Sequence, residues 1–234
     1  MLETKNVSKS FLTKQVLKNV NFTLKPGSIY ALLGPNGSGK TTWMKLAAAL
    51  SKPSKGTITL DDQPISIKSR EKIVFLPTEN FFYNNMTIKD VGLYYDDFFA
   101  DFSIEKYHDL INKMDLSEKS KIKTLSSGML AKVKIAAAMS RNAPYYLLDE
   151  PLNGIDLIAH DEVMQTIIES LNEDATIVIS SHLVEELEPY VNQAIFFKQG
   201  EMIEQCDVEE LRDTQGVSLA DHYRTFMKGD FLHA

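Results

Sequence analysis

The feature that most constrains the fold of this chain is a glycine-rich segment at residues 34–42. It reads Gly-Pro-Asn-Gly-Ser-Gly-Lys-Thr-Thr and satisfies the pattern G-x-x-x-x-G-K-[ST]. An almost wholly apolar run precedes it at 28–33, and a helix-like stretch follows at 40–50. In the order strand, turn and helix, backbone N–H groups and the helix N-terminus face phosphate oxygens. The segment therefore predicts a phosphate-binding loop, with an ordinary strand-to-helix turn as the alternative.

Two side chains of this loop would carry its chemistry. The Lys40 ammonium would bridge the β- and γ-phosphates, and the Thr41 hydroxyl would coordinate Mg²⁺. The other loop residues would surround the nucleotide: Gly34, Pro35, Asn36, Gly37, Ser38, Gly39 and Thr42. The loop thus predicts ATP and Mg²⁺ as ligands.

A second motif supplies acidic residues. The apolar strand 145–148 ends in Asp149 and Glu150, which is the Walker B arrangement. Asp149 would hold Mg²⁺ through its water shell, and Glu150 would polarise the attacking water as a general base. Adjacent acids after a strand otherwise form a solvated turn or open a helix. The phosphate loop upstream favours the catalytic interpretation.

Between the two motifs lies 125–129, Leu-Ser-Ser-Gly-Met, directly before a helix-like stretch. It resembles the signature of the ABC (ATP-binding cassette) ATPases, usually Leu-Ser-Gly-Gly-Gln, and precedes the acidic strand by that family's spacing. Ser126, Ser127 and the N–H groups around Gly128 would form a second anion site. The resemblance implies that this site serves nucleotide held by another copy, in a head-to-tail dimer. A plain serine N-cap is the alternative.

The resemblance covers the chain from Leu2 to about Glu204. Phe11 resembles the aromatic residue that stacks on adenine, although cross-strand packing would also explain it. His182, directly after the apolar strand 176–180, resembles the switch histidine that contacts the γ-phosphate. It would position the attacking water together with Glu150.

Two segments depart from the family pattern. Residues 75–80 match the Q-loop but contain no glutamine; Thr78 takes its place with Glu79 beside it, and either oxygen would join the magnesium shell. In the signature, Ser127 replaces a glycine and Met129 replaces the glutamine. That form resembles single-cassette ATPases of ABC-2-type and drug or peptide exporters. Every group needed for hydrolysis nevertheless has a candidate, so we expect an active ATPase.

The rest of the pattern predicts an α/β P-loop NTPase fold with a RecA-like core. Alternating residues at 2–11 and 16–24 predict an N-terminal antiparallel β lobe. We expect an ABC ATPase domain at 1–205, a helical subdomain inserted at about 80–140, and a short C-terminal helical extension at 206–234.

Composition restricts the partners. With 25 basic and 32 acidic residues the net charge is −7, which argues against nucleic acid. No run approaches the roughly 18–20 apolar residues of a membrane-spanning helix, so we expect no direct membrane insertion. Because Cys206 is the only cysteine, the chain has no internal disulfide.

The resemblance implies a transport ATPase in the cytoplasm, peripheral on the inner face of the cell membrane. Its partners would be separately encoded membrane-spanning subunits and a second ATPase subunit, either an identical chain or a paralogue. Two alternatives stay open: a soluble ABC-type ATPase that acts on DNA or ribosomes, and a nucleotide-dependent scaffold with low turnover. The sequence contains neither the insertions of the DNA-repair relatives nor the second cassette of the translation relatives, which argues against the first alternative.

Overall fold

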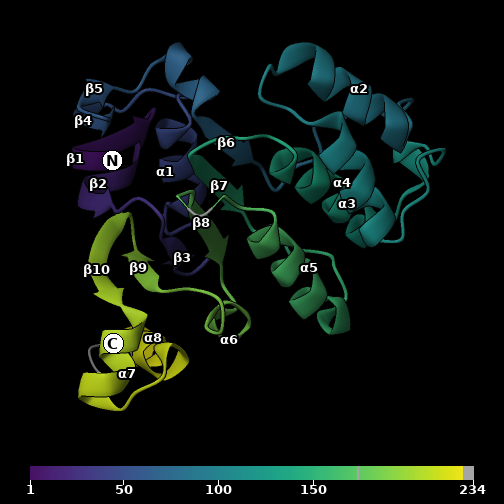
Figure 1. Ribbon diagram of the computed structural model, residues 1–234. Helices are drawn as coiled ribbons and strands as arrows, with labels where there is room; N and C mark the ends of the chain where they lie inside the picture. The colour runs from purple at the N-terminus through teal and green to yellow at the C-terminus, as the bar shows by residue number, and fades with distance from the viewer. Residues whose placement is uncertain (173, 229–234) are drawn as a thin grey trace.

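The computed structural model describes residues 1–172 and 174–228, and its strands form two sheets (Figure 1). The smaller, N-terminal sheet is antiparallel and has the order β2-β1-β4-β5. Its strands are β1 (Leu2–Phe11), β2 (Lys14–Leu24), β4 (Lys55–Leu60) and β5 (Gln63–Pro64). The predicted β lobe is therefore present.

The larger sheet has the order β10-β9-β3-β8-β7-β6, and all its strands except β10 are parallel. They are β3 (Ile29–Leu33), β6 (Ile73–Leu76), β7 (Tyr145–Asp149), β8 (Thr176–Ser181), β9 (Gln193–Lys198) and β10 (Glu201–Asp207). The central strands are nearly continuous apolar runs because helices and the smaller sheet cover both faces. Their carboxyl ends meet at one edge, where ligands of open α/β sheets bind.

Helices surround this sheet in three groups (Figure 1). Helices α2, α3 and α4 form a separate lobe at the upper right, α1 and α5 flank the sheet, and α6, α7 and α8 lie below it. Their bounds are α1 (Lys40–Ala47), α2 (Ile88–Phe98), α3 (Ile104–Lys113), α4 (Ser127–Met139), α5 (Leu157–Glu169), α6 (Val184–Leu187), α7 (Val208–Gln215) and α8 (Leu219–Lys228), with short 3₁₀ turns at Ile67–Glu71 and Ile122–Thr124. The predicted α/β fold with an inserted helical lobe is confirmed.

The core has two parts, one on each face of the larger sheet. Ala31 and Leu33 of β3 face the part shared with the helical lobe, whereas Tyr30 and Leu32 face α1 and the β lobe. Trp43 of α1 is fully buried, and its indole N–H donates a hydrogen bond to Thr4 Oγ1 at 3.1 Å. Helix α1 is thus fixed between the two sheets, which fixes the loop that precedes it.

One predicted boundary differs from the structure, and the predicted domain division is not tested by it. The helix expected to reach residue 50 ends at Ala47, since the chain turns at Ala49 with φ 56°. The predicted division at 205/206 falls inside β10, and 229–234 of the predicted extension lie outside the described residues. That division stays a prediction.

Across residues 1–172 and 174–228, each helix is too short or too polar to span a bilayer.

Candidate active site

The loop between β3 and α1 depends on two glycines with positive φ. Gly34 has φ 154°, and a Cβ there would lie 2.2 Å from the carbonyl oxygen of Phe197. Gly39 has φ 113°, and its Cβ would lie 2.6 Å from a methyl carbon of Leu17. Any larger residue would collide with backbone or core at these positions. The glycine pattern is therefore a steric requirement of this loop.

Lys40 is folded back into the loop. Its ammonium donates a hydrogen bond to the carbonyl oxygen of Gly34 at 2.7 Å and lies 3.8 Å from Glu150 Oε1. The side chain is only 6 % exposed, and this burial lowers the pKa of Lys40, opposed by the negative charges of Glu150 and Asp149. A cation held beside carboxylates and carbonyl oxygens is well placed to exchange them for phosphate oxygens.

A polar cavity of about 310 Å³ opens over this loop. Its lining includes Thr78, Glu150 and His182 together with the loop residues from Asn36 to Thr42. The buried Ser38 hydroxyl has no hydrogen-bond partner within the described part of the chain. An unpartnered buried hydroxyl in a glycine cradle fits a site for phosphate oxygens.

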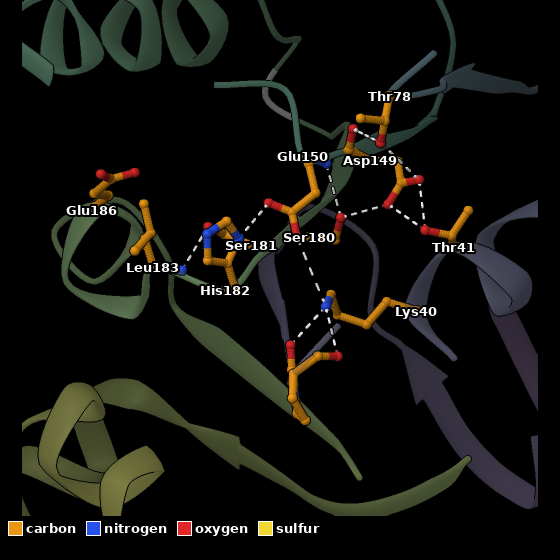
Figure 2. A network of polar contacts seen from close by, with 12 residues as sticks. Lys40, Thr41, Thr78, Asp149, Glu150, Ser180, Ser181, His182, Leu183 and Glu186 are labelled. Atoms are coloured by element: carbon orange, nitrogen blue, oxygen red, sulfur yellow. Dashed lines mark hydrogen bonds and ion pairs between the residues drawn. The ribbon is translucent and has the colours of Figure 1, made fainter. Parts of the chain in front are cut away.

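Four oxygen-bearing side chains converge beside the cavity (Figure 2). Thr41 Oγ1 donates to Asp149 Oδ2 at 2.8 Å, and Ser180 Oγ donates to Asp149 Oδ1 at 2.8 Å. Thr78 Oγ1 lies 3.1 Å from the Asp149 carbonyl oxygen and 3.2 Å from Oδ2. A set made only of hydroxyl and carboxylate oxygens, without sulfur or imidazole, suits Mg²⁺. The structure thus brings Thr41, Thr78 and Asp149 together.

Glu150 has a strained backbone, with φ 49° in the left-handed region that non-glycine residues rarely adopt. Its N–H donates to Ser180 Oγ at 2.9 Å. Its carboxylate lies between Lys40 and His182, whose Nδ1 is 3.0 Å from Glu150 Oε2 (Figure 2). The three predicted catalytic residues therefore form one connected group.

Glu79 lies apart from the other magnesium candidates. Its side chain is largely exposed, and Oε1 is 3.5 Å from the ammonium of Lys45. A hydrogen bond from its own backbone N–H, followed by the nearby Lys45 and Lys134, lowers the pKa of Glu79. Of the two Q-loop candidates, only Thr78 is seen in contact with Asp149.

Two residues of the site were not predicted. Ser180 is fully buried beside Asp149, its register partner in the neighbouring strand, so strand pairing would have revealed it. Lys134 of α4 is 7 % exposed and donates to the carbonyl oxygen of Thr78 at 2.7 Å. Burial lowers the pKa of Lys134 to about 8. No local sequence signal marks Lys134, because only the fold brings α4 to β6.

The signature segment lines a different cavity. Ser126 caps α4 by accepting the N–H of Met129 at 3.2 Å, and Ser127 Oγ donates to the carbonyl oxygen of Gly154 at 3.3 Å. With Gly128 they border a second cavity of about 410 Å³, which shares no lining residue with that of the phosphate loop. Within one chain, the two predicted phosphate sites are separate.

Phe11 is also placed away from the phosphate-loop cavity. It ends β1 with its side chain half exposed, and the Lys9 ammonium lies 4.8 Å from its ring centroid. Val16 of the next strand lines the cavity, whereas Phe11 is not among the lining residues. Adenine stacking on Phe11 stays a prediction.

Comparison with known proteins decides the family. Residues 17–153 match the family model described as ABC transporter. The ABC transporter ATP-binding protein YtrB of Bacillus subtilis (strain 168) is 31 % identical over 216 residues, which cover 91 % of this chain and 74 % of YtrB. The chain belongs to the ABC transporter family.

Other members of this family match over similar lengths. The Nod factor export ATP-binding protein I of Burkholderia lata is 28 % identical, and the match covers 97 % of this chain and 81 % of that protein. The solved dimeric structure of MJ0796, a bacterial ABC transporter cassette, superimposes with a TM-score of 0.79 at 26 % identity, covering 88 % of this chain and 98 % of that one.

Membership confirms the predicted family, fold and enzyme class. The chain is an ATP-binding subunit of an ABC transporter, an ATPase that hydrolyses ATP to power transport. ABC cassettes dimerise and pair with membrane subunits.

Proposed function

We propose that this chain is the Mg²⁺-dependent ATPase of an exporter, bound at the inner face of the cell membrane. Two cassettes, identical or paralogous, would enclose two ATP molecules head-to-tail and drive separately encoded membrane-spanning subunits. The observation that carries the proposal is the connected group of Lys40, Glu150 and His182 beside the Asp149 oxygen cluster.

The geometry supports a proposed role for each member of this group. Lys40 neutralises Glu150 in the resting chain; once its ammonium binds phosphate oxygens, the carboxylate is free to accept a proton from the attacking water. His182 at 3.0 Å holds Glu150 in place. The strained φ of Glu150 fixes this carboxylate at the cavity wall.

Mg²⁺ would neutralise charge on the β- and γ-phosphates. Thr41 and Asp149 would hold it, with the Thr78 hydroxyl as the third contact. Glu79 would take part only through water, because its carboxylate lies with Lys45.

The head-to-tail arrangement explains why the signature lies apart from the phosphate loop. Ser126, Ser127 and Gly128 at the start of α4 would complete the site of the other cassette. A dimer of a similar cassette is known in the MJ0796 structure.

Export is supported by two observations. The Nod factor export protein matches nearly the whole chain, and the Ser-Ser-Gly-Met form of the signature resembles that of exporter ATPases. Vesicles that contain the cognate membrane subunits, with the cytoplasmic face outward, would test the direction. An exporter accumulates its substrate inside these vesicles, and movement of substrate toward the cytoplasmic face would contradict the proposal.

The decisive experiment compares Glu150→Gln with the wild type in ATP turnover and in oligomeric state, with and without Mg²⁺. We expect turnover to fall by roughly 100-fold or more, as for loss of a general base, while ATP and Mg²⁺ trap the variant as a dimer. Glu105→Gln, at an exposed glutamate in the first turn of α3 that does not line the cavity, is the matched control and should keep near wild-type turnover. Undiminished turnover in Glu150→Gln would exclude Glu150 as the base, and a wild type that binds ATP without turnover would favour the scaffold alternative.

A further inference from the structure

A cluster of three side chains lies away from the ATP site, where α8 packs on the larger sheet. Glu204 and Cys206 are two residues apart in β10 and therefore point to the same face of the strand. His222 of α8 reaches onto that face, and its Nε2 lies 3.1 Å from Glu204 Oε2. One carboxylate oxygen, the thiol sulfur and one imidazole nitrogen all lie within 4.8 Å of one another.

We propose that Glu204, Cys206 and His222 bind a divalent transition metal ion of the Zn²⁺ class, which joins α8 to β10. A sulfur, a nitrogen and an oxygen donor together form a ligand set that Zn²⁺ accepts. Mg²⁺, the ion of the ATP site, prefers oxygen ligands and would not compete well here.

The distances suit this ion after small side-chain rotations. Tetrahedral Zn²⁺ with ordinary bond lengths places its ligand atoms roughly 3.3–3.8 Å from one another. The Glu204–His222 contact at 3.1 Å is already near this spacing, and the longest separation of at most 4.8 Å must close by about 1 Å. Three protein ligands leave the fourth position for water. A polar cavity of about 240 Å³ is lined by Glu204 and Cys206.

The surroundings of the three side chains favour a bound cation and restrict the motion of the ligand side chains. Asp207 and Glu210 line the same cavity, so the local charge is negative. Phe196 of β9 packs edge-to-face on the His222 ring with centroids 5.6 Å apart, and it stacks on Tyr223 at 6.1 Å. These rings hold α8 so that His222 lies over the strand. This order reduces the entropic cost of binding a metal ion.

Binding must displace the thiol proton. Burial first, and then the charges of Glu204 and Asp207, raise the pKa of Cys206 to about 12. A bound metal ion reverses this preference, since a coordinating thiol loses its proton. Each metal ion bound should therefore release a proton to the buffer.

The test uses the full chain, stripped with a chelator and free of nucleotide, titrated with Co²⁺ as a spectroscopic probe and with Zn²⁺ by calorimetry. We expect a single ion per chain at micromolar affinity or tighter, and a near-ultraviolet cobalt–thiolate band together with the visible bands of tetrahedral Co²⁺. Cys206→Ser should abolish the thiolate band, and His222→Gln should weaken binding by about tenfold or more.

The matched control is His108→Gln, since His108 also pairs with a glutamate, Glu118, but lies in α3 with no thiol in the pair. It should bind Zn²⁺ as the wild type does. Wild-type protein without a stoichiometric thiolate band would overturn the proposal. So would an equal Zn²⁺-induced rise in melting temperature for wild type and for Cys206→Ser, a comparison that also reveals whether each variant is folded.

Discussion

At the scale of single residues, Ser180 links the two acids of the site. Its hydroxyl donates to Asp149 and accepts the N–H of Glu150, and the side chain is fully buried. Ser180→Ala leaves that N–H without a partner, so we expect a loss of about 1–3 kcal/mol in the free energy of unfolding. Loss of a residue that orients a metal ligand should also weaken apparent Mg²⁺ affinity by about 10- to 100-fold. Urea unfolding and the Mg²⁺ dependence of ATPase activity measure both effects.

Ser140→Ala is the control for this variant. Ser140 is equally buried, and its hydroxyl donates only to the carbonyl oxygen one turn earlier in α4. It should lower stability slightly and leave the Mg²⁺ dependence unchanged. The role assigned to Ser180 would be wrong if both variants behaved alike.

Lys134 gives the chain a pH-dependent stability. Its pKa is lowered to about 8 by burial, so in the folded state the charged form is disfavoured relative to the unfolded chain. Between about pH 8 and the ordinary lysine pKa, the unfolded chain binds more protons than the folded one, and stability from this group rises with pH. The urea midpoint of the wild type should therefore rise from pH 7.5 to pH 9.5 relative to that of Lys134→Met.

Lys132→Met, on the same helix, controls for the lost charge and should follow the wild type across this pH range. A parallel pH dependence in Lys134→Met and the wild type would contradict the assignment. Because Lys134 donates to Thr78, its removal should also disturb the segment that replaces the Q-loop glutamine.

The contributions of single residues show what the sequence could reveal. Two local motifs, whose spacing reflects the turns that they form, contain Lys40 with Thr41 and Asp149 with Glu150. These four residues could therefore be predicted from the sequence, and the structure brings them together. Ser180 depends on strand register, which the sequence does not state.

At the scale of elements, most strands could be predicted because buried parallel strands are apolar and short. Strand β10 was missed, since four of its seven residues are polar, although Gln199 and Gly200 before it form a tight hairpin turn with φ 49° and 85°. In the helical extension predicted at 206–234, the first helix begins at Val208, because Asp207 caps it by accepting the N–H groups of Glu209 and Glu210.

The last two helices are held by one partly buried acid. Glu188, 14 % exposed, accepts the N–H groups of Leu219 and Ala220 at 3.0 and 3.2 Å and the guanidinium of Arg212 at 3.0 Å. It therefore connects the end of α6 with α7 and with the N-terminus of α8. We expect Glu188→Ala to cost about 1–3 kcal/mol and to raise amide hydrogen exchange throughout α7 and α8.

The control is Glu185→Ala, which removes the exposed ion pair with Arg224. An exposed pair contributes little, so this variant should lose at most about 1 kcal/mol and keep the exchange pattern. Equal exchange in both variants would show that Glu188 does not hold the two helices. Since α6 follows His182, the same experiment reports whether order in α8 reaches His182.

At the scale of the whole molecule, the two predicted phosphate sites of one chain lie in separate cavities. The phosphate loop belongs to the larger sheet, and the signature opens a helix of the inserted lobe. On the proposed assignment each chain would hold two incomplete half-sites, and a head-to-tail dimer would complete both. The proposed dimer would make activity a property of pairs of chains, which mixtures of variants can test.

Two inactive variants should restore activity when they are mixed. Lys40→Ala removes the phosphate-binding ammonium, whereas Ser126→Asp keeps the N-cap of α4 but places a carboxylate where the second phosphate would lie. In a head-to-tail heterodimer both defects fall in one composite site and the other stays intact. If the chains pair at random, half of the dimers are mixed and each has one intact site, so ATPase activity should approach at most about one quarter of the wild-type value. A mixture no more active than its two components would mean that the signature does not act on nucleotide bound by the partner.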